Sequence, residues 1–279
     1  MVKSNYNIIV IKLTEAKNMF DYHIHSSVSF DSESSAYDIA LAAKAKGLKE
    51  ICFTDHFDHN SDKEKTHNTI DIAKYNEAYD GLLVDGLKIK LGVEFGLTDW
   101  NKPELSEFIA LKPFDFVIGS IHFVDGADPY DYDYWVGKTE REAYLGYLER
   151  ILQCVEIHNS FDVLGHLTYV SRSIYNPTKN LLRYRDYAEI CDEIFKALIK
   201  KDKGIEINTS GKNALGVLLP SYDFVKRYRE LGGKIITVGS DAHAPLRVGE
   251  HIDEALALAK EVFGYVCTFD KRTPVFNKL

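Results

Sequence analysis

The segment Phe20-Asp21-Tyr22-His23-Ile24-His25 begins the pattern that decides the fold. Alternate residues of a strand point to opposite faces, so an extended segment projects His23 and His25 to one face and Ile24 to the other. The same spacing returns in Asp241-Ala242-His243, directly after a second predicted strand at 234–240. Two such pairs at strand ends predict a place where metal-binding side chains gather.

Short apolar runs alternate with amphipathic stretches along the rest of the chain. We expect strands at 20–25, 50–54, 88–95, 114–122, 163–168, 204–209 and 234–240, with a weaker one at 265–268. We expect helices at about 36–47, 71–85, 103–111, 139–158, 182–202, 220–232 and 251–263. Seven successive βα units predict a parallel sheet, either closed into a barrel or doubly wound, with its site at the carboxyl ends of the strands.

The composition excludes several classes of protein. The 279 residues include 34 Lys and Arg against 42 Asp and Glu, a formal net charge of −8. Proteins that bind nucleic acid or anionic membranes usually need a basic face, so we expect neither kind of partner. The 45% of hydrophobic residues suffice for a core, and no apolar run approaches the roughly 20 residues that cross a bilayer.

The chain organisation is simple. We expect one domain over 19–279, preceded by a dispensable N-terminal extension at 1–18, because strand patterning starts directly after Met19. Four scattered cysteines without a CxxC pair favour a reduced, cytoplasmic compartment.

Residues of the kind that bind metals occur at nearly every predicted strand end. They are His23 and His25, Asp55 and His56, Glu94, His122, His166, Glu206 and Asn208, and finally Asp241 and His243. Nitrogen and oxygen ligands suit Zn²⁺, Mn²⁺ or Fe, and this many ligands predict two or three ions. Glu94 is a carboxylate in an apolar run, which is costly unless a cation compensates it. The strand before Thr54-Asp55-His56 is expected to break into a loop there. If the strand continued, Asp55 would point away from His56, so we expect Asp55 to support the site rather than to bind metal.

Six motifs together resemble the PHP (polymerase and histidinol phosphatase) superfamily, and within it the histidinol-phosphate phosphatase branch. The motifs are His23-Ile24-His25-Ser26, Thr54-Asp55-His56, Gly92-Val93-Glu94, Gly119-Ser120-Ile121-His122, Gly165-His166 and Gly239-Ser240-Asp241-Ala242-His243. The resemblance covers nearly the whole chain from about Phe20. It implies a distorted (β/α)7 barrel, similar to a TIM barrel, with a trinuclear metal centre at the carboxyl ends of the strands.

The resemblance also implies roles for individual residues. One ion would be held by His23, His25, Glu94 and Asp241. A second ion would share Glu94 and add His122 and His166, and a third would be held by Asp31, His56 and His243. The family's phosphate clamp uses arginines after the fifth-strand and sixth-strand motifs. Arg172 fits the first position, Lys212 or Asn213 stands at the second, and Arg247 is another candidate.

The implied reaction is hydrolysis of the phosphate monoester of L-histidinol phosphate by metal-activated water, without an organic cofactor. Besides Glu94, Asp241 and His243 are candidate catalytic residues, since either of them or a coordinated water could protonate the leaving group. The alternatives are a nucleotide or nucleoside-bisphosphate phosphoesterase, a protein-tyrosine phosphatase, and a metal-binding module without activity. We expect a monomer or homodimer that acts on a small phosphorylated substrate.

The segment 125–137 combines four aspartates, at 125, 128, 131 and 133, with Tyr130, Tyr132, Tyr134 and Trp135. It has the composition of an active-site lid that could meet a cationic imidazole or amine. A solvated acidic loop is the alternative interpretation.

Overall fold

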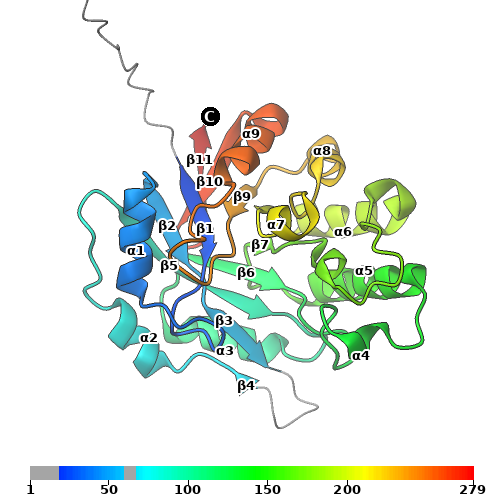
Figure 1. Cartoon of the computed structure of the whole chain (residues 1–279), viewed down its shortest axis with the longest axis horizontal. Coiled ribbons are helices and arrows are strands. Elements are labelled where there is room, and N and C mark those ends of the chain that lie inside the picture. Colours follow the sequence, from blue (N-terminus) through cyan, green and yellow to red (C-terminus); the bar gives the residue numbers. More distant parts are fainter. Residues whose placement is uncertain (1–18, 60–66) are drawn as a thin grey trace, which may run out of the picture.

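The computed structural model describes residues 19–59 and 67–279, and the predicted extension at 1–18 lies outside them. Seven parallel strands form the central sheet of the described chain in the order β1-β2-β5-β6-β7-β8-β9 (Figure 1). Their bounds are β1 (Phe20–Ile24), β2 (Glu50–Phe53), β5 (Lys88–Gly96), β6 (Phe116–Ser120), β7 (Val163–Leu164), β8 (Gly204–Asn208) and β9 (Ile236–Gly239).

The sheet closes on itself just beyond β9. Asp241 N donates to His23 O at 2.8 Å, and His25 N donates to Ala242 O at 2.9 Å. These bonds join the segment after the last strand to the first strand, which a doubly wound sheet would leave apart. The predicted (β/α)7 barrel is therefore confirmed, and the doubly wound alternative is wrong.

Helices surround the barrel, with α1 and α2 on one side and α5 and α6 on the opposite side (Figure 1). Their bounds are α1 (Ala36–Ala45), α2 (Ile72–Tyr79), α3 (Lys102–Leu111), α4 (Tyr132–Trp135), α5 (Glu140–Ile157), α6 (Ala188–Lys200), α7 (Gly211–Leu215), α8 (Tyr222–Glu230) and α9 (Ile252–Phe263). In α6 the buried side chains recur at three- and four-residue steps, at Cys191, Ile194, Phe195 and Leu198. This stripe packs toward the strands while charged residues face solvent.

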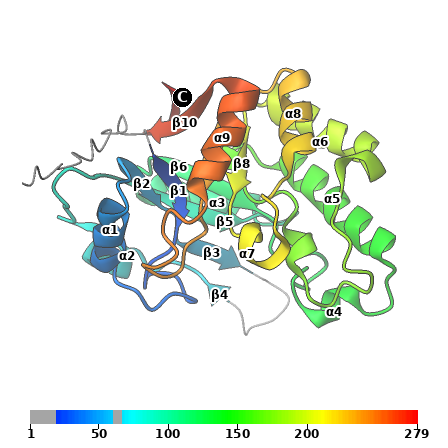
Figure 2. The ribbon, with the colours of Figure 1, turned by 45° about the horizontal axis from the view of Figure 1, so that its top comes forward.

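Two hairpins extend the barrel. The predicted loop after Asp55 is wrong, because the chain resumes there as β3 (His56–His59), which pairs with β5 through His56 and Glu94. The same strand forms an antiparallel pair with β4 (His67–Asn68). The weaker predicted strand at 265–268 is confirmed as β10 (Tyr265–Asp270), and it pairs with β11 (Thr273–Lys278), which the sequence did not predict. Figure 2 shows the second hairpin beside α9.

The fifth strand is much shorter than the predicted 163–168. The backbone N–H of His166 donates to the Glu206 side chain at 2.9 Å, so it does not continue the ladder. The chain then turns through a 3₁₀ helix at Tyr169–Arg172. Similarly, the predicted helix 182–202 begins only at Ala188, after a 3₁₀ turn at Tyr184–Asp186. Both departures lie near the carboxyl end of the barrel or in the segment that leads away from it.

The core consists of strands that are buried on both faces. Every residue of β1, β6 and β8 is buried, and these strands belong with the inner helix faces to one hydrophobic cluster. Such continuous burial is typical of parallel barrel strands. Among the described residues, no helix combines the length and the apolar character needed to cross a membrane.

Candidate metal centre and active site

The side chains predicted to bind metal meet at the carboxyl ends of the strands. Each is placed by a strand end or by the loop that follows it. They are His23 (β1), His25 and Asp31 after β1, His56 (β3), Glu94 (β5), His122 after β6, His166 after β7, and Asp241 and His243 after β9. Strand parity, barrel closure and loop direction thus bring nine residues from seven segments to one rim.

Glu94 lies at the centre of the cluster and is fully buried. Its Oε2 is 3.1 Å from His23 Nε2 and 3.1 Å from His56 Nδ1. Its Oε1 is 2.8 Å from His166 Nε2 and 3.3 Å from His122 Nε2. The two oxygens therefore face different pairs of imidazoles, which is the geometry that a carboxylate bridging two ions requires.

Two aspartates extend the cluster toward the pocket. Asp241 Oδ1 is 3.4 Å from His25 Nε2 and 3.7 Å from His23 Nε2. Asp31 Oδ2 is 3.0 Å from His243 Nε2 and 3.5 Å from His56 Nε2. Both arrangements match the groupings that the family resemblance implies for the first and third ions.

In the part of the chain that the structure describes, four overlapping sets of three residues have ligand atoms within 4.8 Å of one another. Glu94 belongs to two of these sets, as expected of a bridging ligand. His56 also belongs to two, since it lies between Glu94 and His243. The sets are His23, Glu94 and His166; His23, His25 and Asp241; His56, Glu94 and His122; and His25, His56 and His243.

Several polar atoms at the centre of this cluster have no hydrogen-bond partner although they are buried. They include His23 Nε2, His25 Nε2, His56 Nδ1 and Glu94 Oε2. Orphaned buried polar atoms are rare in folded proteins because each costs desolvation energy. Imidazole and carboxylate donors that converge without partners are the donor set of a divalent cation such as Zn²⁺, so these residues fit the implied metal ions.

The electrostatics of the cluster also favour bound cations. Burial alone would raise the pKa of Glu94, but the facing imidazoles of His23 and His56 hold it well below its ordinary value. Burial likewise opposes a charge on His23, yet the carboxylates of Glu206 and Glu94 raise its pKa well above the ordinary value. The carboxylates thus remain ionised beside protonated imidazoles, and a bound divalent cation would supply the positive charge instead and displace the imidazole protons.

Two further carboxylates orient His23 and His122 by contacting the ring nitrogen that faces away from Glu94. Glu206 Oε1 is 2.7 Å from His23 Nδ1, and Asp58 Oδ1 is 2.8 Å from His122 Nδ1. A carboxylate on the far ring nitrogen fixes which nitrogen is free to bind a metal. Asp58 was not predicted from the sequence, although it stands two residues after His56 and therefore on the same face of a continued strand.

Asp55 has the supporting place that the sequence predicts for it. Its Oδ1 accepts from Ser26 N at 2.7 Å and from Ser29 Oγ at 3.0 Å. Ser29 Oγ in turn lies 3.2 Å from His25 Nδ1. Asp55 thus fixes the loop after β1 and acts on His25 through Ser29.

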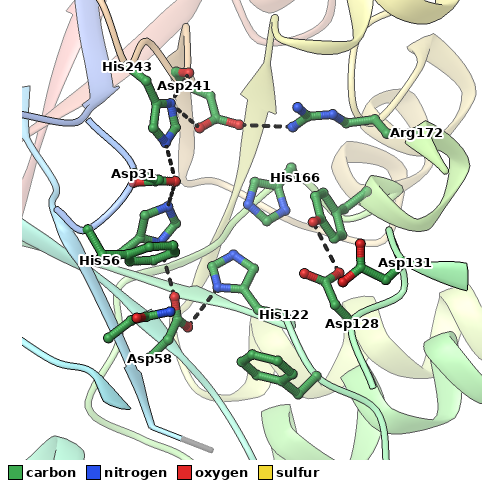
Figure 3. Close-up of a pocket in the computed structure, with 14 residues that line it drawn as sticks. Asp31, His56, Asp58, His122, Asp128, Asp131, His166, Arg172, Asp241 and His243 are labelled. Carbon is green, nitrogen blue, oxygen red and sulfur yellow. Dashed lines mark hydrogen bonds and ion pairs between the residues drawn. The ribbon is translucent and has the colours of Figure 1, made fainter. Parts of the chain in front are cut away.

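A cavity of about 310 Å³ opens beside the cluster, and Arg172 lines it with the candidate ligands (Figure 3). Arg172 Nη1 lies 3.3 Å from Asp241 Oδ2 and donates to Ser210 Oγ at 3.2 Å. Its guanidinium also lies over the Tyr169 ring, 5.5 Å from the centroid. Arg172 is therefore a preorganised cation beside Asp241.

The other two basic candidates do not line this cavity. Lys212 Nζ pairs with Glu254 at 2.7 Å and donates to Gly216 O at 3.2 Å. Arg247 pairs with Glu250 on its own turn of chain. Among the predicted phosphate contacts, the geometry therefore favours Arg172 and argues against Lys212 and Arg247.

The acidic segment 125–137 contributes to the cavity with only part of its length. Asp128 and Asp131 line the cavity, whereas Asp125 pairs with Arg150 at 2.6 Å. Tyr134 and Trp135 are buried in the core. The segment is therefore anchored in the core through α4, and Asp128 and Asp131 form part of the wall of the cavity.

A barrel with a cluster of histidines and carboxylates at its rim defines a class of metal-dependent hydrolases, and the comparisons identify the family. The PHP domain family matches residues 21–210, which is more than half of the chain. This chain belongs to that family.

Within the family, the chain is similar to histidinol-phosphatases. The histidinol-phosphatase of Lactococcus lactis is 35% identical over 255 residues, which cover 89% of this chain and 93% of that protein. A probable histidinol-phosphatase of Clostridium acetobutylicum is 33% identical over 91% of this chain and 98% of that protein. The crystal structure of the Lactococcus lactis histidinol phosphate phosphatase with zinc, L-histidinol and phosphate superposes with a TM-score of 0.83 and 32% identity, covering 92% of this chain and 99% of that chain.

Proposed function

We propose that this chain is a metal-dependent phosphatase that hydrolyses L-histidinol phosphate to L-histidinol and phosphate. The observation that carries the proposal is one cavity lined by both the histidine–carboxylate cluster and Arg172. Relatives that share at least 33% identity over most of the chain are histidinol-phosphatases or probable ones. The Lactococcus lactis enzyme was crystallised with both products of this reaction.

Three groups of residues would hold the ions. They are His23, His25, Glu94 and Asp241; Glu94, His122 and His166; and Asp31, His56 and His243. The orphaned nitrogens of His23, His25 and His56 support this assignment. When bound, divalent cations would lower the pKa of coordinated water and neutralise charge on the phosphoryl oxygens. Zinc is our first choice of metal, since it accompanies the Lactococcus lactis enzyme.

The residues of the chain supply the remaining requirements of the reaction. Arg172 would bind the phosphoryl group with a guanidinium already held in place by Ser210 and Asp241. Asp241 is ionised, because the surrounding histidines hold its pKa well below the ordinary value against the effect of burial. Because Asp241 also lines the cavity, its carboxylate would be placed to accept a proton from the attacking water and return it to the leaving alkoxide. Burial of Glu94, His23 and His25 excludes bulk water from the centre.

A substrate panel tests the proposal. The protein purified with zinc or manganese would be given L-histidinol phosphate, adenosine monophosphate, adenosine 3′,5′-bisphosphate and a phosphotyrosine peptide, and released phosphate would be measured. We expect kcat/KM for L-histidinol phosphate to exceed the others by at least 100-fold. Preference for a nucleotide or for the peptide would instead favour one of the other branches of the family, and bound metal without any turnover would favour an inactive module.

The Glu94→Gln variant tests the metal centre within this proposal. The amide cannot bridge two cations, so we expect metal content and turnover to fall together, with turnover reduced by at least 1,000-fold. Glu50→Gln is the matched control, because Glu50 is a buried glutamate that contacts Tyr22 and Lys88 at the start of β2. Full turnover of Glu94→Gln would contradict the assignment.

A further inference from the structure

One wall of the active-site cavity is acidic. Asp128 and Asp131, which belong to the loop between β6 and α4, line the cavity together with His122 and His166. Figure 3 shows them on the side of the pocket opposite Asp31. The cavity thus has candidate metal ligands on one side and a pair of carboxylates on the other.

Tyr169 connects these two sides. Its ring lies 5.1 Å from the His166 ring and 6.0 Å from the His122 ring, measured between centroids. Its hydroxyl donates to Asp128 Oδ1 at 3.2 Å. Asp128 therefore lies about one tyrosine side chain away from the histidines of the metal centre, within the span of a small organic substrate whose phosphate is held at that centre.

The charge of this wall is not balanced by protein cations. Within residues 19–59 and 67–279, neither Asp128 nor Asp131 forms an ion pair, whereas Asp125 in the same loop pairs with Arg150. Both hydrogen bonds that described residues donate to the Asp128 carboxylate, from Tyr130 N and Tyr169 Oη, end on Oδ1. Burial raises the pKa of Asp128, so a cation beside it would relieve a real cost.

A second feature of the same cavity indicates that it takes a ligand. His166 lines the cavity and is almost fully buried, yet its Nδ1 has no hydrogen-bond partner. The cavity is therefore bordered by a histidine with a buried, unpartnered nitrogen and by two carboxylates that no described lysine, arginine or histidine pairs with.

We infer that Asp128 and Asp131 form the subsite for a positively charged nitrogen of the substrate. The pocket would then select phosphate monoesters that also carry an organic cation, with Arg172 and the metal centre holding the phosphate and the acidic wall holding the nitrogen. This inference rests on the proposed function, because L-histidinol phosphate carries both an ammonium and an imidazole. Either group has the required chemistry, and the test separates them.

The first arm measures selectivity. Steady-state kinetics of Asp128→Asn and Asp131→Asn would compare L-histidinol phosphate with p-nitrophenyl phosphate, which has no cationic nitrogen. We expect the ratio of the two kcat/KM values to fall at least 10-fold, mainly through a higher KM for L-histidinol phosphate. Asp133→Asn is the matched control, since Asp133 is an exposed aspartate of the same segment outside the cavity. An unchanged ratio in both variants would overturn the inference.

The second arm identifies the nitrogen. Competitive inhibition by L-histidinol would be compared with that by 3-(imidazol-4-yl)propan-1-ol, which lacks the amine. Weakened inhibition by L-histidinol alone in Asp128→Asn assigns the subsite to the ammonium, and weakened inhibition by both assigns it to the imidazole. Unchanged inhibition by both would contradict the subsite. Should Asp128→Asn fail to fold, the exposed Asp131→Asn carries the same comparison.

Failure of the proposed function has a different signature. Wild-type protein that hydrolyses phosphoethanolamine but not L-histidinol phosphate would refute the proposed substrate. Loss of selectivity for the cationic ester in Asp128→Asn would still support the acidic subsite in that case. Wild-type protein without any preference for cationic esters over p-nitrophenyl phosphate would overturn the subsite itself.

Discussion

The replacement Glu206→Gln provides a sharp test of how the protein prepares His23 for a metal. Glu206 is buried, and its Oε1 lies 2.7 Å from His23 Nδ1. A carboxylate only accepts hydrogen bonds, so it places the imidazole proton on Nδ1 and leaves the Nε2 lone pair facing Glu94. His23 Nε2 has no hydrogen-bond partner and lies 3.1 Å from Glu94 Oε2.

Glutamine should reverse this tautomer. Glu206 Oε2 accepts from His166 N at 2.9 Å and from Asn208 Nδ2 at 3.1 Å. Those two donors will hold the glutamine oxygen at the Oε2 position, which turns its NH₂ group toward His23 Nδ1. The imidazole proton must then move to Nε2, where it blocks the metal. Loss of such a supporting carboxylate typically costs 10- to 100-fold in metal affinity, or about 1.4 to 2.7 kcal/mol.

Calorimetric titration in competition with a chelator would measure the zinc affinity of Glu206→Gln. We expect a 10- to 100-fold weaker site, and turnover of L-histidinol phosphate that recovers when the metal concentration is raised. Glu50→Gln, a buried change at the opposite end of the strands, should bind zinc like wild type. A Glu206→Gln variant with wild-type zinc affinity would refute the tautomer argument.

Three further predictions follow from the structure. Arg172→Lys should raise KM for L-histidinol phosphate about 10-fold because lysine lacks the bidentate fork. Steady-state kinetics would compare it with Arg247→Lys, which should leave KM unchanged; an equal rise of KM in both variants would contradict the assignment. Gly96→Ala should weaken metal binding because its Cβ would clash with Asp58 Oδ1, the atom that orients His122, and wild-type affinity in chelator titrations would contradict this. Burial lowers the pKa of His158, so the unfolded chain binds a proton that the folded chain does not, and the free energy of unfolding falls as the pH drops below about 6.5. Urea unfolding at pH 7 and 5.5 should therefore show a smaller loss of stability for His158→Gln than for wild type, and an equal loss would refute this role.

The local patterns predicted a parallel sheet and the location of the centre at its carboxyl edge, whereas the choice of a barrel over a doubly wound sheet came only from the family resemblance. His23 and His25 lie on one face of a short strand, and Asp241 and His243 repeat that spacing where the barrel closes. Such regularities depend only on neighbouring residues, so one chain suffices to find them. The matching of Glu94 with four imidazoles, by contrast, depends on long-range register.

Asp58 was missed because the strand before it was expected to end at Thr54. The chain bends at Asp55 and then continues beside the second half of β5, as the pairing of His56 with Glu94 shows. The alternation His56-Phe57-Asp58 contains the information, since it repeats the spacing of His23 and His25. A local pattern could therefore have identified Asp58, had the strand been extended past the bend.

The candidate phosphate-binding residues could not be ranked from the sequence in this way. Arg247 follows a metal motif closely, yet its side chain pairs with Glu250 three residues later. Pairs at this spacing are local and could have been considered from the sequence. Arg172 reaches the cavity only because β7 ends at Leu164 and the chain turns through a 3₁₀ helix. The early end of the strand depends on the Glu206 side chain, which no local pattern reveals.

The formal charge of −8 gains a physical meaning from this arrangement. Carboxylates line the cavity on several sides, and Arg172 is the one lysine or arginine among its described lining residues. Such a cavity repels a phosphate monoester unless cations occupy it. Three divalent ions would change the formal balance from −8 to about −2 and concentrate that change at the cluster. An acidic protein can thus attract an anionic substrate through its metals while the outer acidic wall still favours a cationic nitrogen.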